Sequence, residues 1–296
     1  MKPAPFAYFA PQSLDEALAL LQEHGYDGKL LAGGQSLIPA MNFRLAQPAA
    51  LIDINRIAAL SFLAPDAEGG LRIGAMTRQR TVERSELVAR RAPLLHATMP
   101  SIAHVQIRNR GTIGGTLAHA DPAAELPAVM VALNARFRLQ SLRGERWVNA
   151  TDFYTGLFAT ALEPDELLAE IATPPLPPRT GWAMHEFARR RGDYAIVGVA
   201  ATVTLNPAGE CQDARLVYLS VGEGPTPAEG AVAALRGQSP TPAAIAEAAR
   251  IAAQEIEPLG DIHATPAYRR HLIEVLGRRA LTDAVARAQQ ANPPAG

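Results

Sequence analysis

The stretch LLAGGQSLIP, residues 30–39, decides how this chain folds at its N-terminal end. A short apolar run stops at two adjacent glycines, and a polar pair and a second apolar run follow. Glycine tolerates positive φ and lets another group approach the backbone closely. Successive free N–H groups in such a turn form a concave anion site. The stretch therefore predicts a strand that ends in an anion-binding loop, although a glycine pair alone is more often an ordinary tight turn.

A second cluster, GTIGGT at residues 111–116, has the same character. It follows a polar segment, residues 108–110, which we expect to be a turn. The hydroxyls of Ser36, Thr112 and Thr116 add hydrogen-bond donors to the two clusters. Neither cluster matches the Rossmann or P-loop pattern. Two such loops in one α/β unit favour a dinucleotide whose two phosphates are held from both sides.

The organisation around the clusters is mixed helix and strand. Ser13 and Glu16 form a capping box before an apolar periodic run that stops at Gly25. Four prolines between 173 and 178 exclude a helix or central strand there and predict a domain boundary. We expect helices over residues 13–24, 81–89, 122–134, 242–254 and 268–290, and strands over residues 29–31, 49–54, 71–76 and the segments AIVGVAATVTL and ARLVYLSVG.

Composition limits the function classes. The 296 residues carry a net charge of −1, so nothing points to nucleic acid. No apolar run is long enough to span a bilayer and no signal-peptide pattern opens the chain, so we expect a cytoplasmic protein without a membrane span. The single cysteine, Cys211, excludes an internal disulfide and an iron–sulfur cluster held by this chain alone. No histidine pair has metal spacing, which favours an organic redox cofactor.

Three segments then carry a family resemblance: AGGQSLIP, QIRNRGTIGGTLAHADPAAELP and ARRRGDYAIVGVAA. In this order and spacing they resemble the FAD-binding medium subunit of molybdenum hydroxylases of the aerobic carbon monoxide dehydrogenase and xanthine dehydrogenase family. The resemblance covers nearly the whole chain. It implies an α+β protein with a two-subdomain FAD-binding fold of the vanillyl-alcohol oxidase (PCMH) type over residues 1–177. The subdomains would be about 1–57 and 58–177, followed by a C-terminal domain over 178–286 with a small antiparallel sheet and helices, and a frayed tail over 287–296.

The resemblance also implies roles for individual residues toward FAD. Apolar Ile102 would pack against the cofactor, Glu125 would hydrogen-bond the adenosine ribose, Leu167 would lie near the adenine or flavin end, and Tyr194 near the isoalloxazine. Two loops would hold the pyrophosphate and neighbouring atoms, the first made of Lys29, Leu30, Leu31, Ala32, Gly33, Gly34, Gln35 and Ser36, and the second of Gly111, Thr112, Ile113, Gly114, Gly115 and Thr116.

The chain departs from relatives at four of these positions. Gln35 stands where relatives often have His, Thr116 where they have Asn or Ser, and Glu125 where most have Asp. Glu186 stands where many carry a lysine near the flavin. A cation there stabilises a reduced, anionic flavin, and a carboxylate opposes it. Three explanations stay open: Glu186 turns to solvent, Arg189 or Arg190 compensates, or the flavin has a lower potential.

The function implied by the resemblance is electron transfer within a heterotrimer. A large subunit with a molybdenum cofactor would hydroxylate the substrate, and a small subunit with 2Fe–2S clusters would pass electrons to FAD in this chain. The electrons would leave to an external acceptor, and the assembly would be a dimer of heterotrimers. No catalytic acid or base and no metal ligand is expected in this chain. Two alternatives stay open: a self-contained FAD-dependent reductase of the same superfamily, and a flavin-free assembly subunit.

Two acidic residues have expected structural roles. Asp53, at the end of a predicted strand, is expected to orient the first glycine loop. Asp121 is expected to act as the N-cap of the helix that follows it.

Overall fold

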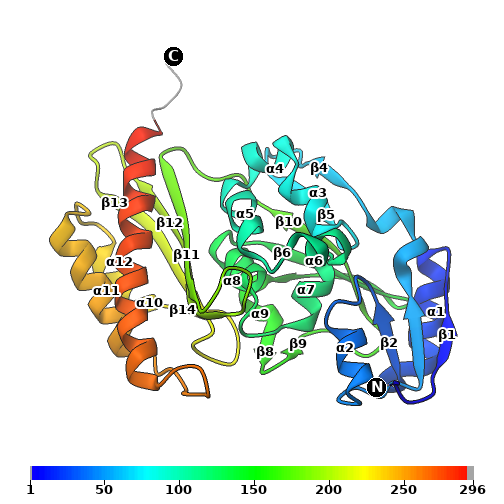
Figure 1. Cartoon of the computed structure of the whole chain (residues 1–296). Helices are drawn as coiled ribbons and strands as arrows, with labels where there is room; N and C mark the ends of the chain where they lie inside the picture. The colour runs from blue at the N-terminus through cyan, green and yellow to red at the C-terminus, as the bar shows by residue number, and fades with distance from the viewer. Residues whose placement is uncertain (1, 292–296) are drawn as a thin grey trace.

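The computed structural model describes residues 2–291, which build three main sheets in succession along the chain and one further sheet of two short strands (Figure 1). The N-terminal sheet has the strand order β1-β3-β2 and is parallel. Its strands are β1 (Ala7–Phe9), β2 (Gly28–Leu31) and β3 (Ala50–Asp53), and its helices are α1 (Leu14–His24) and α2 (Leu37–Asn42). The capping box is confirmed, because Ser13 Oγ accepts from the Glu16 N–H at 3.2 Å and begins α1.

The middle sheet is antiparallel with five strands in the order β4-β5-β10-β6-β7. Its central strand, β10, comes last in the sequence. The helices between β5 and β6 form a layer in front of the sheet (Figure 1). The elements are β4 (Leu63–Pro65), β5 (Leu71–Gly74), α3 (Gln79–Glu83), α4 (Glu86–Arg91), α5 (Pro93–Thr98), α6 (Val105–Arg110), α7 (Ile113–His119), α8 (Glu125–Ala132), β6 (Arg136–Ser141), β7 (Gly144–Asn149), α9 (Ala150–Phe153), β8 (Tyr154–Gly156), β9 (Ala159–Thr160) and β10 (Leu167–Thr173).

Three expectations for this middle region are wrong. A single helix over 81–89 is broken, because Ser85 Oγ accepts from the Val88 N–H and starts a new helix, α4. The expected turn over 108–110 is the last turn of α6. The helix expected from residue 122 begins at Glu125, because Asp121 closes a turn by accepting from the Ala123 N–H at 2.9 Å. Asp121 is therefore a turn former and not the N-cap.

The C-terminal sheet is antiparallel in the order β11-β12-β13-β14, and α11 (Pro242–Glu255) and α12 (Pro266–Gln290) cover one of its faces (Figure 1). Its strands are β11 (Thr180–Ala188), β12 (Ala195–Leu205), β13 (Cys211–Leu219) and β14 (Thr226–Pro227), with the short α10 (Glu229–Leu235) beside them. Because α12 continues to Gln290, the expectation of a frayed tail from residue 287 is wrong for its first residues. The rest of that expectation, residues 292–296, lies outside the described residues.

Two apolar cores join neighbouring sheets. One contains Leu18 of α1 together with Leu167 and Ala169 of β10. Another contains the middle helices together with Ala200 and Leu219 of the C-terminal sheet. Buried apolar contacts of this kind fix the relative positions of the sheets, because each buried side chain removes its surface from water. The α+β fold class is confirmed, including the small antiparallel C-terminal sheet. Among the described helices, none is both long and apolar enough to cross a bilayer.

Candidate functional site

The first glycine loop, which leaves β2 and enters α2, presents unpartnered backbone donors. Within residues 2–291, the N–H groups of Gly33, Gly34, Gln35 and Ser36 make no hydrogen bond to the protein. Gly34 has φ of 73°, a left-handed conformation that favours glycine. Consecutive free donors in a turn of this shape form an anion site, and a pyrophosphate offers the matching acceptors. The loop therefore fits the phosphate part of a dinucleotide.

The second glycine cluster has a different local structure. Most of its N–H groups donate within the protein: Ile113 to the Thr77 carbonyl, Gly114 to the Ala75 carbonyl, and Gly115 to the Thr112 hydroxyl. Thr112 is thereby the N-cap of the short helix α7. The second cluster therefore contributes mainly to the shape of the site and offers few free N–H donors to a ligand.

Close approach of neighbouring segments explains three of the glycines. A Cβ on Gly33 would lie 2.5 Å from the carbonyl oxygen of Arg110, and a Cβ on Gly114 would lie 2.4 Å from the Ala75 Cβ. A Cβ on Gly115 would lie 3.3 Å from the Ala32 Cβ. A side chain at Gly33 would push the two loops apart, and one at Gly114 would push the second loop away from Ala75, so both positions require glycine for the loops to line one groove.

A polar network ties the loops together. The Asn55 side-chain amide donates to the Ala32 carbonyl at 2.8 Å, and Asn55 Oδ1 accepts from Arg78 at 2.6 Å. Arg78 also donates to the Arg110 carbonyl, which belongs to the second loop. Asp53 accepts from the Asn55 backbone N–H at 2.9 Å, so the expectation that Asp53 orients the first loop is confirmed.

The same network concentrates positive charge beside the loops. Burial and the nearby Arg110 lower the pKa of the Arg78 guanidinium, and Asp53 opposes them in part. An anion in the groove would relieve the repulsion between these two arginines. The sequence analysis missed Asn55 and Arg78. The sequence feature that could have identified Asn55 is its position shortly after the strand that pairs with β2.

The two substituted loop residues contribute hydrogen bonds within the loops. Gln35 donates from its amide to the Gly33 carbonyl at 3.0 Å, and so closes the first loop upon itself. Thr116 accepts from the Gln79 amide at 2.9 Å. Both substitutions therefore preserve loop geometry through a polar contact made inside this chain.

Ile102 lies in a turn held by a buried arginine. Arg108 donates to the carbonyl oxygens of Ile102 at 2.8 Å and Ala103 at 3.1 Å, and Ala103 has φ of 43°. The same guanidinium forms two hydrogen bonds with Glu83, at 2.9 and 3.0 Å. This contact with Arg108 lowers the pKa of Glu83 to about 2. Ile102 is only 6% exposed, so its side chain supports the wall of the groove.

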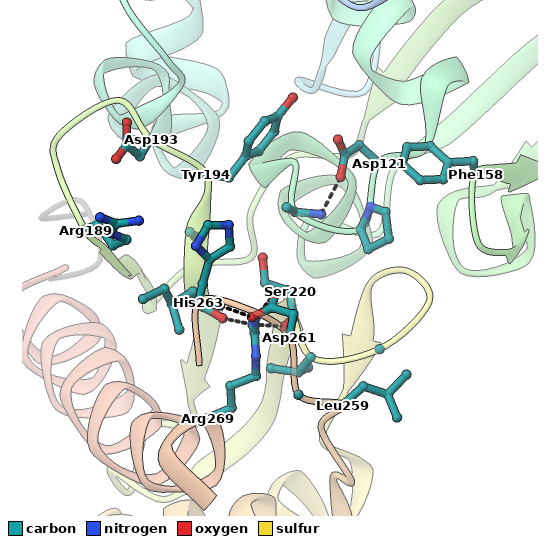
Figure 2. Close-up of a pocket in the computed structure, with 17 residues that line it drawn as sticks. Asp121, Phe158, Arg189, Asp193, Tyr194, Ser220, Leu259, Asp261, His263 and Arg269 are labelled. Carbon is teal, nitrogen blue, oxygen red and sulfur yellow. Dashed lines mark hydrogen bonds and ion pairs between the residues drawn. The ribbon is translucent and has the colours of Figure 1, made fainter. Parts of the chain in front are cut away.

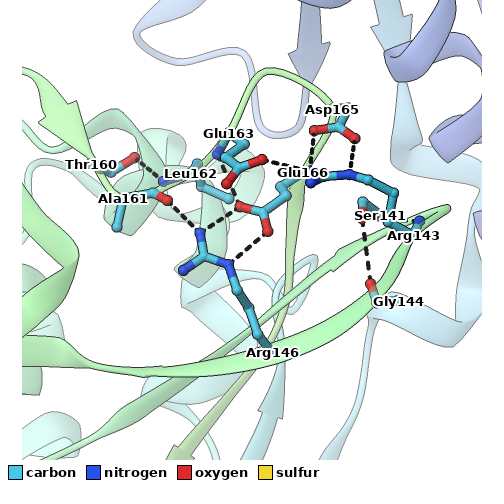
Figure 3. A network of polar contacts seen from close by, with 10 residues as sticks. All are labelled: Ser141, Arg143, Gly144, Arg146, Thr160, Ala161, Leu162, Glu163, Asp165 and Glu166. Carbon is cyan, nitrogen blue, oxygen red and sulfur yellow. Dashed lines mark hydrogen bonds and ion pairs between the residues drawn. The ribbon is translucent and has the colours of Figure 1, made fainter.

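Leu167 is placed by the network shown in Figure 3. The neighbouring Glu166 accepts twice from Arg146, both at 2.7 Å, and also from the Glu163 N–H at 2.9 Å. Arg143 pairs with Glu163 and Asp165 on the same loop. These contacts fix the start of β10. Leu167 itself is 1% exposed and packs into the core against α1, so its side chain supports the groove from within the protein.

Asp121, Glu125 and Glu186 form a set of acidic side chains that act electrostatically on one another or on Tyr194. Burial raises the pKa of Glu125 to about 8, and the charges of Glu186 and Asp121 add to the shift. Burial also raises the pKa of Glu186 to about 7. Burial, with Asp121 and Glu125, raises the pKa of Tyr194. The charges of these groups thus act on one another, and the contact of Glu125 with the adenosine ribose stays a prediction.

A pocket of about 550 Å³ opens beside Tyr194 (Figure 2). Tyr194 and Asp121 lie on one side of the pocket, and Asp261 and Arg269 lie on the other. Arg269 donates to Asp261 at 2.6 Å and to the Ser220 carbonyl at 2.7 Å. The pocket adjoins the groove through Tyr194, which is 67% exposed. No group of three or more potential metal-ligating side chains occurs within residues 2–291.

Comparison with known proteins assigns the fold and the groove to a class. Residues 4–176 match the family described as "FAD binding domain in molybdopterin dehydrogenase", and residues 182–284 match the "CO dehydrogenase flavoprotein C-terminal domain". The first part of the chain is therefore an FAD-binding domain, and the chain is a flavoprotein component of an oxidoreductase.

Relatives that match almost the whole chain narrow this class. The chain is 41% identical to the alpha subunit of the 6-hydroxypseudooxynicotine dehydrogenase complex of Paenarthrobacter nicotinovorans, over 98% of this chain and 97% of the relative. It is 39% identical to the carbon monoxide dehydrogenase medium chain of Hydrogenophaga pseudoflava, over 97% and 99%. A carbon monoxide dehydrogenase structure from the same organism aligns with a TM-score of 0.94 at 40% identity, over 97% of this chain and 99% of that chain. The protein belongs to the family of medium, FAD-binding subunits of molybdenum hydroxylases.

Proposed function

We propose that this chain binds one FAD along the groove, with the pyrophosphate at the first glycine loop and the isoalloxazine ring at Tyr194. The four free N–H groups of Gly33–Ser36 are the observation that carries this proposal. The close contact of Gly33 with the second loop and the positive charge of Arg78 beside Arg110 support it. FAD would supply reversible two-electron chemistry, and the protein would supply placement and electrostatics.

The residues divide this work along the groove. Gly33 and Gly34 present backbone donors to the phosphates, while Asn55 and Arg78 hold the two loops at a fixed separation. Ile102, held by Arg108, and Leu167, held by the start of β10, form a rigid apolar support. Because these side chains are buried, the groove is preorganised before the cofactor enters.

We further propose that the chain works as the electron-transfer subunit of a heterotrimer in the cytoplasm. A large molybdenum-cofactor subunit would oxidise the substrate, and a small subunit with 2Fe–2S clusters would deliver electrons to FAD. The names of the relatives support this, since they are subunits of dehydrogenase complexes. The single cysteine, Cys211, is buried, so this chain offers no set of thiolates for a cluster. We expect a dimer of heterotrimers, with the subdomains dividing near residue 57 and the C-terminal domain starting near 178.

The exit for electrons would be the pocket beside Tyr194. This pocket is lined by Tyr194 together with Phe158 and Leu259 (Figure 2). An external acceptor that enters it would be separated from the ring only by Tyr194. Replacing Tyr194 with Ala should then change the rate of reoxidation by the acceptor while FAD stays bound.

Absorption and mass spectrometry test the proposal directly. The full chain, purified alone and from its native source, should show flavin absorption and release FAD on denaturation. Copurification of a molybdenum subunit and an iron–sulfur subunit would support the heterotrimer. Oxidation of a nicotinamide cofactor by the chain alone would favour the self-contained reductase. A colourless chain that does not take up added FAD would favour the assembly subunit.

A further inference from the structure

Gln79 contacts both ends of the second glycine cluster. It is the first residue of α3 and is only 2% exposed. Its backbone N–H donates to the Gly111 carbonyl at 2.9 Å, and its side-chain amide donates to the Thr116 hydroxyl at 2.9 Å. The side-chain oxygen of Gln79 lies against Gly111, because a Cβ on that glycine would be 2.7 Å from it. One buried residue therefore holds the first and the last residue of the cluster.

The contact between Gln79 and Thr116 has a direction. An amide nitrogen only donates, so the Thr116 oxygen accepts there, and a hydroxyl has one hydrogen that rotates to suit its neighbours. Within residues 2–291, the Thr116 hydroxyl donates to no protein acceptor. Two other helical threonines differ, because the hydroxyls of Thr98 and Thr282 each donate to the carbonyl four residues earlier, at 2.8 Å. The Thr116 hydroxyl therefore keeps its hydrogen for an acceptor that is not a described part of the chain.

The oxygen of the Gln79 side chain is buried and unpaired. Its Oε1 atom has no hydrogen-bond partner among the described residues. A buried acceptor without a partner costs free energy, and an apolar side chain of similar length would avoid that cost. Stability alone therefore does not account for an amide at position 79, whereas the donation of its N–H to Thr116 does.

The Thr116 end of the cluster adjoins the first glycine loop. Gly115 and Thr116 are partly exposed, whereas residues 111–114 are buried. A Cβ on Gly115 would lie 3.3 Å from the Ala32 Cβ, so this end lies against the loop that carries the four free N–H groups. Phosphate oxygens accept hydrogen bonds, and donors aimed at them form strong, charge-assisted contacts. A hydroxyl whose oxygen is already engaged by Gln79 offers its hydrogen to such an acceptor.

We propose that Gln79 is a positioning residue that directs the Thr116 hydroxyl as a hydrogen-bond donor to the phosphate groups of FAD. The proposal rests on the proposed function, because FAD binding places a pyrophosphate at the first loop. Gln79 acts only through Thr116, since its own side chain is buried. Thr116 adds one directed side-chain donor to the backbone donors of Gly33–Ser36, so the second cluster contributes a hydrogen bond as well as shape.

A double-mutant cycle on the full chain tests the proposal, with the dissociation constant of FAD as the readout. T116V should weaken FAD binding about tenfold, because a hydrogen bond to a charged group is lost. Q79M should weaken it about threefold in the wild-type background and have no further effect in the T116V background. T116S keeps a hydroxyl, so it should retain wild-type affinity and the sensitivity to Q79M.

A purely structural role for Gln79 predicts a different pattern. Q79M would then weaken FAD binding by the same factor in the wild-type and T116V backgrounds, and this result would overturn the proposal. Wild-type affinity of Q79M would also overturn it. Q140M is the matched control, because Gln140 on β6 likewise has a buried amide oxygen without a partner in the described part of the chain. It should leave FAD affinity unchanged in both backgrounds.

Q79E is the second variant, and it keeps the test valid if Q79M folds poorly. A carboxylate only accepts hydrogen bonds, so it would draw the Thr116 hydrogen away from the phosphates. The T116V background measures the effect of the added charge alone. Q79E should therefore weaken FAD binding more in the wild-type background than in the T116V background, and equal losses would overturn the proposal.

ADP separates this proposal from the proposed function, because it carries two phosphates without the flavin. The cycle repeated with ADP should show the same dependence of the Q79M effect on Thr116. Such a dependence in a chain that fails to bind FAD would refute the proposed function and support the role of Gln79. FAD binding without this dependence would refute the role of Gln79 alone. Failure to bind either ligand would refute both.

Discussion

The Asn55 side chain joins the Ala32 carbonyl to the Arg78 guanidinium, with contacts of 2.8 and 2.6 Å. Ala32 belongs to the first glycine loop, and Arg78 reaches the second loop through the Arg110 carbonyl. One amide therefore sets the separation of the two loops that form the phosphate end of the groove. This relationship carries a direct prediction for cofactor affinity.

Replacing Asn55 with Ala should weaken FAD binding about tenfold and lower the free energy of unfolding by about 1–2 kcal/mol. The variant leaves the Arg78 guanidinium with the Arg110 carbonyl but without its acceptor on Asn55, and it removes the side-chain link from Asn55 to the first loop. Fluorescence quenching of FAD on titration with the chain measures the affinity. Asn149→Ala, which removes a contact with Asp152 on the far side of the middle sheet, is the control. Equal affinity for the two variants would contradict the role given to Asn55.

Replacing Gly34 with Val should reduce FAD content strongly while leaving the C-terminal domain folded. Gly34 has φ of 73°, and a Cβ there would lie 3.2 Å from both Leu31 and Ile38. A left-handed conformation costs a residue with a side chain about 1–2 kcal/mol, so the loop would rearrange and scatter its N–H groups. Gly209→Val is the matched control, because Gly209 also has positive φ but lies in open space. The flavin-to-protein ratio after purification checks the expectation, and an unchanged ratio for Gly34→Val would count against the anion site.

Replacing Arg108 with Gln should destabilise the chain by about 3–5 kcal/mol, because Glu83 would lose its buried partner. Its contact with Arg108 lowers the pKa of Glu83 to about 2. The stability from this pair is present above the unfolded pKa, near 4.5, and is lost as the pH falls toward 2. Urea unfolding at several pH values measures both effects. Arg90→Gln removes an exposed pair with Glu86 and should change stability by less than about 1 kcal/mol.

Replacing Glu186 with Lys should raise the midpoint potential of bound FAD at pH 8. The lysine would pair with Glu125 and would favour a negative charge on the reduced ring. A shift of at least about 30 mV, or about 1.4 kcal/mol for a two-electron couple, is expected from dye-equilibrium titration. Glu257→Lys controls for the change of net charge. A lowered potential would show that Glu186 lies away from the ring.

Much of the local structure could be predicted from the sequence. The capping box placed the start of α1, the apolar runs placed β2, β3, β12 and β13, and the glycine pairs marked both loops. Each of these features depends on the conformational preferences of neighbouring residues, so a short pattern carries it. The family resemblance added the cofactor class, through three segments in a fixed order.

The sequence by itself therefore determined the fold class, the glycine loops and the absence of cluster-forming cysteines. Only the tertiary structure decided that the free donors belong to the first loop, that Arg78 and Asn55 join the two loops, and that Glu125 is buried. These relationships depend on which surfaces pack together across three sheets. The charge state of a carboxyl group depends on its burial and on neighbours distant in the chain, and no local pattern contains either quantity.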